Sequence, residues 1–406
     1  MVRKHRALEI FRCVFFSVAI LITIPAAQGQ EHGISSGDQR GKLYVLDAGN
    51  NHKKAKVLVV DQSNGKVVHT YHAGDQPDMA LSPDGRQLFV SYFVEIAEGR
   101  RESVLDIYDT ASGTLIDHVS NPQALQHKLP VYESSMVMAP SGKQIYIEKY
   151  HWTPGAPGPS GCYVSVFDTE QRRFRGVNIS IFNCGHVVLP SREDLKFYMV
   201  SAGTHSIDEF TLVIPSEGAT NTSHRSIPIE FPKSVDSSSE VKSSNAATTP
   251  CEVGQRAPAK TLGPVFFLGE EGMIGAVLND GSRLAVDLST AVTKFMGKEP
   301  ATGTAPGMQA ALHRDNSPVY FSAGQETNNY FERYDQIVRM DPATMAITGK
   351  MTTSSPFFSM SMSPDENILF TVNPQRAKIT VIDALSLKEM SQFSVGVKPI
   401  FAIAAP

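Results

Sequence analysis

Short apolar or alternating runs recur along this chain, and residues with turn preferences separate them. Residues 56–93 contain four such runs, Val57–Val60, Val67–Tyr71, Met79–Leu81 and Gln87–Ser91. Each run has the length of a strand and is too short for a stable helix, and Val, Leu and Tyr favour extended structure. The pattern therefore predicts a unit of four short strands.

The turns between these runs have a chemical basis. In Ser82-Pro83-Asp84-Gly85, the proline presets φ for a type I turn, the aspartate can accept backbone N–H bonds, and the glycine adopts a positive φ at little steric cost. Asp61 ends the first run, and we expect it to cap the following turn in the same way.

The four-strand unit repeats along the chain. Runs that end in Asp recur at 105–109, 163–168, 284–287, 337–341 and 379–383, and Pro-containing turns recur at 139–142, 189–192 and 363–366. A unit of this kind with a period of roughly 40–60 residues is typical of propeller blades, which bury their faces only against neighbouring blades. Counting the units predicts about seven blades.

Two stretches depart from the pattern. Residues 205–231 lose it, and residues 265–295 keep the strands but lack the proline turn. Between them, 234–258 is rich in Ser, Thr, Ala and Pro, which indicates a flexible insertion rather than a strand.

The two ends of the chain predict how the ring closes. The last run, Ile400–Ala404, corresponds to the first strand of a unit, and the strand that should follow it is found at Leu43–Val45. Such closure pairs the terminal strands and removes exposed edges. The sequence therefore predicts an all-β protein, a seven-bladed β-propeller over residues 41–406 whose last blade is closed by the N- and C-terminal strands.

A targeting segment precedes this domain. Residues 1–12 are basic, Cys13–Pro25 is apolar, and Ala27–Gly29 offers small residues for cleavage. This pattern predicts a secretory signal peptide over residues 1–29, followed by a loose leader over 30–40. The alternative is an uncleaved membrane anchor, although the apolar run is short for a bilayer span and no second run approaches that length.

Composition and charge narrow the range of partners. The 406 residues include 37 Lys and Arg against 41 Asp and Glu, which gives a formal net charge of −4. This near balance argues against nucleic acid or an anionic membrane surface as the main partner. The length allows one large all-β domain, and the 30 Gly and 25 Pro suit a protein rich in turns.

Removal of the signal peptide leaves three cysteines in an oxidising compartment, Cys162, Cys184 and Cys251. Cys162 begins one predicted strand and Cys184 ends the next, so a disulfide across that hairpin is one prediction. A bond between Cys184 and Cys251 is the alternative. No Cys-x-x-Cys motif indicates a haem attachment site or a zinc ribbon.

The chain carries no recognisable catalytic motif. It has no Gly-x-Ser-x-Gly elbow, no Gly-rich phosphate loop and no His-Glu-x-x-His, so we predict no catalytic residue, no bound cofactor and no metal site in this chain. Cys184-Gly185-His186 lacks a further ligand at metal spacing. The recurrent Asp residues and His313-Arg314-Asp315 are interpreted as turn chemistry.

Two loops are candidates for contact with another protein. Residues 95–102, which include Arg100 and Arg101, form a charged excursion between strands, and Trp152 precedes a Pro- and Gly-rich loop at 153–161. Long insertions on one side of a ring can dock a partner. A solvated loop and a loop-packing tryptophan are the alternatives that need no function.

Four stretches together carry a resemblance to a known family: Ile96–Asp109, Cys184–His186, Gly307–Arg314 and Gln336–Pro399. The first three resemble Ile-Ala-Arg-Gly-x-Arg and its following strand, Asp-Cys-Tyr-His, and Gly-Trp-Gln-Gln-Val-Ala-Tyr-His-Arg in the heavy chain of quinoprotein amine dehydrogenases. This is the methylamine and aromatic amine dehydrogenase family, with YVTN-like repeats. The resemblance spans nearly the whole chain after the signal and is weakest over 205–264.

The resemblance implies a periplasmic seven-bladed propeller that pairs with a small, disulfide-rich light chain. It implies that the light chain carries tryptophan tryptophylquinone and the catalytic base, and that electrons leave to a blue-copper protein or a cytochrome. Cross-linking two indoles requires two tryptophans, and this chain has only Trp152, so it cannot form that cofactor. The expected role is a non-catalytic heavy subunit that scaffolds the light chain and walls the substrate channel. Met308 stands where the family has tryptophan, and the family's second cysteine, expected near 198–200, is missing.

Two other functions stay open from the sequence. A free-standing secreted propeller used for binding or scaffolding would show the same repeats without a redox partner. A propeller hydrolase or lyase would need acids or histidines that converge at the mouth of the central channel.

Overall fold

A computed structural model describes the chain over residues 41–50, 54–97, 100–121, 131–152, 159–181, 186–201, 206–213, 221–230, 262–269, 272–278, 280–298, 310–311, 317–324 and 334–406. All of these residues belong to one compact unit, Ile34–Pro406. The expected signal peptide (1–29), leader (30–40) and insertion (234–258) lie outside the described residues and stay predictions. Within the described part, no helix is long and apolar enough to cross a membrane.

Seven strands form one antiparallel sheet in the order β27-β1-β2-β3-β4-β5-β6, which we call the joined sheet. Short apolar runs rich in Val, Leu, Ile and aromatic residues build it, as their strand propensity predicts. The strands are β1 (Lys42–Asp47), β2 (Ala55–Asp61), β3 (Val67–Leu81), β4 (Gln87–Ala97), β5 (Arg100–Asp109), β6 (Leu115–Ser120) and β27 (Pro399–Ala404).

The remaining strands form five four-stranded antiparallel sheets, β7–β10, β11–β14, β15–β18, β19–β22 and β23–β26, in which chain neighbours pair. The first two contain β7 (Val131–Met138), β8 (Gln144–Trp152), β9 (Pro159–Asp168), β10 (Arg173–Ile181), β11 (His186–Pro190), β12 (Lys196–Ser201), β13 (Ser206–Val213) and β14 (Asn221–Pro228). The next two contain β15 (Leu262–Phe267), β16 (Met273–Leu278), β17 (Ser282–Asp287), β18 (Thr293–Lys298), β19 (Ala310–Ala311), β20 (Val319–Ala323), β21 (Tyr334–Met340) and β22 (Ile347–Phe357). The last contains β23 (Ser359–Met362), β24 (Ile368–Asn373), β25 (Lys378–Asp383) and β26 (Lys388–Ser394).

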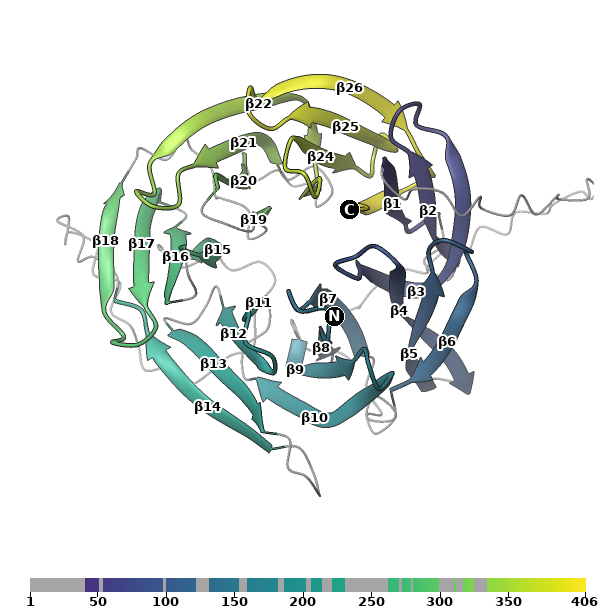
Figure 1. Cartoon of the computed structure of the whole chain (residues 1–406), viewed down its shortest axis with the longest axis horizontal. Coiled ribbons are helices and arrows are strands. Elements are labelled where there is room, and N and C mark those ends of the chain that lie inside the picture. Colours follow the sequence, from purple (N-terminus) through teal and green to yellow (C-terminus); the bar gives the residue numbers. More distant parts are fainter. Residues whose placement is uncertain are drawn as a thin grey trace, which may run out of the picture. The chain divides into compact units, whose positions relative to one another are not determined.

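These sheets follow one another around a ring, which confirms the expected all-β propeller (Figure 1). The expected count of seven separate blades is wrong, because five four-stranded blades stand alone and the other strands share the joined sheet. The cause is β3: Val67–Gly74 pairs with β2, and Asp75–Leu81 pairs with β4. Gly74 at φ 56° and Gln76 at φ 50° redirect the chain without ending the strand, so two four-strand arrays share it.

The two ends of the chain close the ring as expected. Leu43 pairs with Ala404 and Val45 with Ala402, so the C-terminal strand β27 lies beside β1. The Asp47 carboxylate also accepts bonds from the backbone N–H groups of residues 397 and 398, at 3.0 and 2.6 Å. The ladder and this cap join the two ends of the chain, and β1 is paired on both of its sides.

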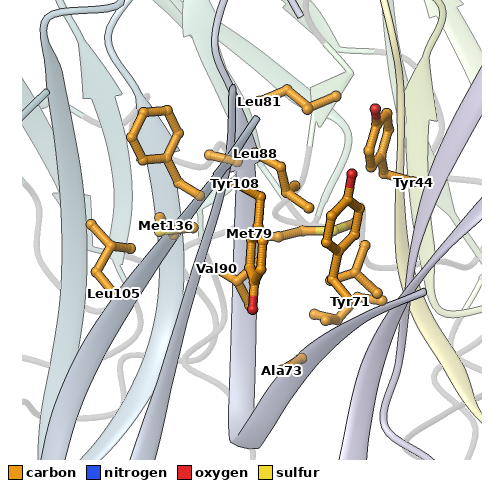
Figure 2. Close-up of a cluster of buried hydrophobic side chains, with 14 of the residues drawn as sticks. Tyr44, Tyr71, Ala73, Met79, Leu81, Leu88, Val90, Leu105, Tyr108 and Met136 are labelled. Atoms are coloured by element: carbon orange, nitrogen blue, oxygen red, sulfur yellow. The ribbon is translucent and has the colours of Figure 1, made fainter. Parts of the chain in front are cut away.

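Apolar side chains fill the space between consecutive sheets. One cluster lies within the joined sheet, where the Tyr71 and Tyr108 rings are 4.7 Å apart next to Met79 (Figure 2), and it extends to Ile145 of β8. Five further clusters each join two neighbouring sheets. One of them connects β24 and β25 back to β1 and so closes the ring. Every sheet is therefore packed on both sides by neighbours, as a blade requires.

The recurrent aspartates cap turns, which confirms the interpretation from the sequence. The Asp61 carboxylate accepts a bond from the Ser63 N–H at 2.8 Å, and Asp383 accepts one from Ser386 at 2.7 Å. Asp109, Asp168, Asp287 and Asp341 do the same in their own turns. Hydrogen bonds from the Ser or Thr hydroxyls and the backbone N–H groups of these turns lower the pKa of Asp61, Asp109, Asp287, Asp341 and Asp383.

Three arginines also join neighbouring sheets. Each guanidinium donates to a backbone carbonyl in a turn of the next sheet, and the pairs are Arg225 with Leu288, Arg283 with Met345, and Arg339 with Leu385. Charged donors make strong bonds to such carbonyls. The arginines therefore add polar contacts between sheets to the apolar packing.

Candidate partner-docking face

The strand ends lie on two opposite sides of the ring. Pro83, in the turn after β3, packs against Gly142, in the turn after β7, so closely that a Cβ on Gly142 would lie 2.9 Å from Pro83 Cδ. These turns define one side, the turn face. Because the strands are antiparallel, the β4–β5 and β8–β9 connections lie on the other side, which we call the hairpin face.

Two of the hairpins that point to the hairpin face, β4–β5 and β8–β9, are long. β4 and β5 have 11 and 10 residues, and β8 and β9 have 9 and 10, whereas β16 and β17 have 6 each. The β4–β5 ladder continues through Glu95 opposite Arg101, and Ile96 is 46% exposed beyond the core. Ordered hairpins that project from a rigid scaffold are suited to contact with another protein.

All three residues predicted to dock a partner lie at the ends of these hairpins. Arg100 and Arg101 begin β5, and Trp152 ends β8, where it pairs with Pro159. The side chains of Arg100 and Trp152 lie outside the described part. The structure therefore places the three predicted residues on one side of the ring, on two neighbouring sheets.

Arg101 is held in place from β3. Its Nη2 atom lies 3.3 Å from Oδ2 of Asp75, and the two side chains are 35% and 14% exposed. A partly exposed pair of this kind adds little to stability, but it fixes the direction of the guanidinium. Arg101 thus presents a positioned charge near the tip of the β4–β5 hairpin.

A buried carboxylate, that of Asp106, anchors the same hairpin farther from its tip than Arg101. Asp106, on β5, is 4% exposed, and its Oδ2 accepts bonds from the hydroxyls of Tyr92 at 2.9 Å and Tyr108 at 3.0 Å. Its Oδ1 lies 2.6 Å from Nδ1 of His118, on β6. The cluster ties three adjacent strands, β4, β5 and β6, through one side chain.

The electrostatics of this cluster indicate a structural role. Burial, and then the Asp106 carboxylate, raise the pKa values of the Tyr92 and Tyr108 hydroxyls well above their usual range. Both tyrosines therefore stay neutral and keep donating to the carboxylate. With both Asp106 oxygens engaged by donors, the group holds the hairpin rather than acting as a base.

At Gly74, where β3 passes from its pairing with β2 to its pairing with β4, the backbone packs against the Tyr92 ring of the same cluster. A Cβ added to Gly74 would lie 2.0 Å from Cδ2 of Tyr92. The residue also has a positive φ of 56°. Only glycine fits both conditions, so the position of the Tyr92 ring depends on this residue.

The sequence did not reveal the Asp106 cluster. Its one signal was a charged residue between Leu105 and Ile107 in an otherwise apolar strand, which indicates a paired carboxylate inside the protein. The identity of its partners, Tyr92 and His118, required the register of β5 against its two neighbours.

The other candidate residues stay untested. Cys162 lies on β9 opposite Tyr150 and Ile181, but its side chain is outside the described part, as are Cys184 and Cys251. The disulfide therefore remains a prediction. Among the described residues, no group of three or more His, Cys, Asp or Glu side chains could hold a metal ion.

The turn face has a small cavity of about 220 Å³, lined in part by the turns at Ser82 and Ser363. Both serine hydroxyls are committed to their own turns, because they donate to Asp84 at 2.6 Å and Asp365 at 2.5 Å. Neither hydroxyl is therefore placed for nucleophilic chemistry.

Comparison with known proteins finds similarity to the same family that the sequence motifs resemble. The family model of the methylamine dehydrogenase heavy chain matches residues 38–222. The methylamine dehydrogenase heavy chain of Methylophilus methylotrophus is 21% identical over 369 residues, which cover 88% of this chain and 82% of that protein.

Solved structures with this fold are diverse. The periplasmic gluconolactonase PpgL of Pseudomonas aeruginosa has a TM-score of 0.60 at 14% identity, with 90% of this chain and 99% of that chain covered. Dihydro-haem d1 dehydrogenase NirN has a TM-score of 0.51 at 11% identity, with 94% and 78% covered. At these identities the likeness establishes the propeller fold alone.

Proposed function

We propose that this chain is a non-catalytic propeller subunit of the methylamine dehydrogenase heavy-chain type, which scaffolds a small light chain in the periplasm. The observation that carries the proposal is the similarity to a methylamine dehydrogenase heavy chain over 88% of this chain. The predicted signal peptide over residues 1–29 supports export.

The hairpin face is the proposed docking surface. It combines two long hairpins, the positioned charge of Arg101 and the exposed side chain of Ile96. The Asp106 cluster pre-orders the β4–β5 hairpin, so little conformational entropy would be lost when a partner binds.

In this proposal the redox group belongs to the light chain. Tryptophan tryptophylquinone is built from two tryptophans, and Trp152 is the single tryptophan here, so the residues of this chain do not fit that cofactor. The light chain would oxidise a primary amine and pass electrons to a blue-copper protein or a cytochrome. This chain would contribute binding and orientation.

Purification of the tagged chain from its own periplasm tests the proposal. We expect a small, cysteine-rich chain with quinone absorbance to co-purify, and the complex to reduce a redox dye when given a primary amine. A pure single chain without a partner, or amine oxidation by this chain alone, would reject the proposal.

A charge reversal then tests the docking surface. Arg101→Glu should reduce the amount of co-purified light chain by about tenfold or more. The change reverses the sign of the charge that the light chain would meet at the interface. Arg86→Glu is the matched control, since Arg86 is also an exposed, ion-paired arginine but lies next to the Ser82–Gly85 turn on the opposite face. Equal loss in both variants would contradict docking on the hairpin face.

A further inference from the structure

Three connections between strands lie where the ring closes, at the pairing of β27 with β1 (Figure 1). They follow β1, β24 and β26 and correspond to residues 48–54, 374–377 and 395–398. The end of β27 and the turn before β24 line the cavity on the turn face, and β1 runs antiparallel to β27. The opposite ends of these strands, with the three connections, therefore lie on the hairpin face.

Backbone hydrogen bonds tie these connections to one another. Ala48 donates its N–H to the Lys398 carbonyl at 2.9 Å, and Val395 donates its N–H to the Ala377 carbonyl at 2.9 Å. The third connection is thus bonded to each of the other two. The side chains that it brings together form one continuous surface of fixed geometry.

Cationic side chains gather on this surface. Lys54, Lys56, His72 and Arg376 are exposed, and Lys378 is partly exposed. Lys56 stands directly opposite His72 in the β2–β3 ladder, so these two side chains lie on the same face of the sheet. We call these five residues the basic patch.

No carboxylate neutralises the basic patch within the part of the chain that the structure describes. None forms an ion pair with any of the five cations there, and the three connections contain no Asp or Glu in their sequence. Asp47 stands opposite Lys56 in the β1–β2 ladder but is only 6% exposed. Its oxygens accept backbone N–H bonds from Gly49, Val397 and Lys398 at 3.1, 3.0 and 2.6 Å, so its charge is directed into the protein.

The turn face, by contrast, carries many carboxylates. Hydrogen bonds within the turns lower the pKa of each one, so all are ionised at neutral pH. They are Asp61, Asp84, Asp109, Asp287, Asp341, Asp365 and Asp383. The formal net charge of −4 therefore conceals a positive patch on one side of the ring and a set of carboxylates on the other. Such a separation orients a charged partner as it approaches.

We propose that the basic patch docks an acidic protein, which binds through a segment rich in Asp and Glu. Charge complementarity of this kind speeds encounter and selects the partner. Val397, which is 52% exposed, lies in the third connection and adds an apolar contact to the cationic surface, and protein interfaces combine the two. The inference does not depend on the proposed light chain, because the patch lies outside the β4–β5 and β8–β9 hairpins.

The shape of the hairpin face favours a protein segment over an extended polyanion. β4 and β5 have 11 and 10 residues, whereas β24 and β25 have 6 each. Each additional strand residue adds about 3.3 Å, so the β4–β5 hairpin rises beyond the basic patch. A flat anionic bilayer would meet that hairpin first. A chain segment can enter beside the hairpin and reach the patch.

Fluorescence anisotropy of a dye-labelled oligoglutamate peptide tests the proposal, with the chain used as purified, including any subunit that it carries. We expect a dissociation constant of roughly 10–100 μM at about 0.01 M salt. Binding should weaken by about tenfold at about 0.1 M salt, where the Debye length shortens from about 30 Å to about 10 Å. Absence of binding at the lower salt concentration would overturn the proposal.

Two matched double variants locate the binding. Lys54→Glu with Arg376→Glu reverses the charge of the basic patch and should raise the dissociation constant by about tenfold or more. Lys294→Glu with Lys388→Glu changes the total charge equally, at exposed positions on the outer strands β18 and β26, and should change the constant by less than about twofold. Equal weakening in both variants would contradict binding at the patch.

Vesicles that contain phosphatidylglycerol test the alternative of a membrane surface. We expect the chain to bind them more weakly than the peptide at the same salt concentration, and the patch variant to change vesicle binding no more than the control variant does. Tight vesicle binding that the patch variant abolishes would assign the patch to a lipid surface and overturn the proposal. Circular dichroism spectra that match the unaltered chain would show that each variant is folded.

Discussion

Replacement of Asp106 by alanine should destabilise the protein strongly. The side chain is 4% exposed and receives bonds from the hydroxyls of Tyr92 and Tyr108 and from the His118 ring. Alanine leaves the Tyr92 hydroxyl without an acceptor and leaves the Tyr108 hydroxyl with the long bond of 3.5 Å to the His72 carbonyl, at about 1–3 kcal/mol each. Removal of the buried charge also relieves its desolvation cost, so we expect a net loss of about 2–4 kcal/mol in the free energy of unfolding.

A set of variants separates this effect from a simple loss of volume. The triple change Asp106→Ala with Tyr92→Phe and Tyr108→Phe removes donors and acceptor together, so it should be more stable than the sum of the single changes predicts. Asp117→Ala is the control, because Asp117 directly precedes His118 on β6. Among the described residues, its carboxylate accepts one bond, from the neighbouring His118 N–H, and its loss should cost about 0.5 kcal/mol.

Equilibrium unfolding in urea, followed by circular dichroism, measures each free energy. A shift in midpoint at constant slope reports stability, whereas a change in slope would report a change in the surface exposed on unfolding. A loss below about 0.5 kcal/mol for Asp106→Ala, or strict additivity in the triple variant, would refute the anchoring role of the carboxylate.

Two further predictions follow from buried tyrosines and from the crossing of β3. Burial raises the pKa of Tyr44 to about 12 and raises the pKa values of Tyr71, Tyr92, Tyr108 and Tyr146 in the same direction. These groups stabilise the fold fully below about pH 10, where unfolded tyrosine titrates, and this stability is lost as the pH rises above that value. Unfolding midpoints measured from about pH 9 to 12 should fall steadily, and a flat profile would contradict burial of these hydroxyls. Gly74→Ala should cost about 2 kcal/mol or more, because its Cβ would lie 2.0 Å from Tyr92 Cδ2 at a φ of 56°. Gly41→Ala is the control, since Gly41 has a φ of 80° but no atom within 4 Å of its Cβ position, so it should lose only about 1 kcal/mol, and equal losses would show that backbone strain alone matters.

The candidate site was predictable only where local chemistry marks it. Arg100, Arg101 and Trp152 stood out as charged or aromatic residues beside loops, and the structure places them on one face. Asp75, the ion-pair partner of Arg101, lies 26 residues away in sequence, and no periodic pattern connects the two. β14 was missed because its polar residues lack alternation, and it forms through pairing with β13.

The sequence by itself determined many of the strands, the aspartate and proline turns, and the closure of the ring. Apolar runs, aspartate caps and proline turns act over a few residues, so their chemistry is visible in the residues themselves. The neighbourhood of the strands at Leu43–Val45 and Ile400–Ala404 was predictable because the missing strand of the last unit had a counterpart at the other end of the chain.

Tertiary structure decided how many separate sheets these strands make and which side chains meet. The sequence predicted separate strands at Val67–Tyr71 and Met79–Leu81, yet β3 runs through both stretches and pairs with β2 along its first half and with β4 along its second. The Asp106 cluster and the pairing of β14 with β13 likewise depend on register between strands. Register is set by the summed packing and hydrogen bonding of whole faces, which no single stretch of sequence contains.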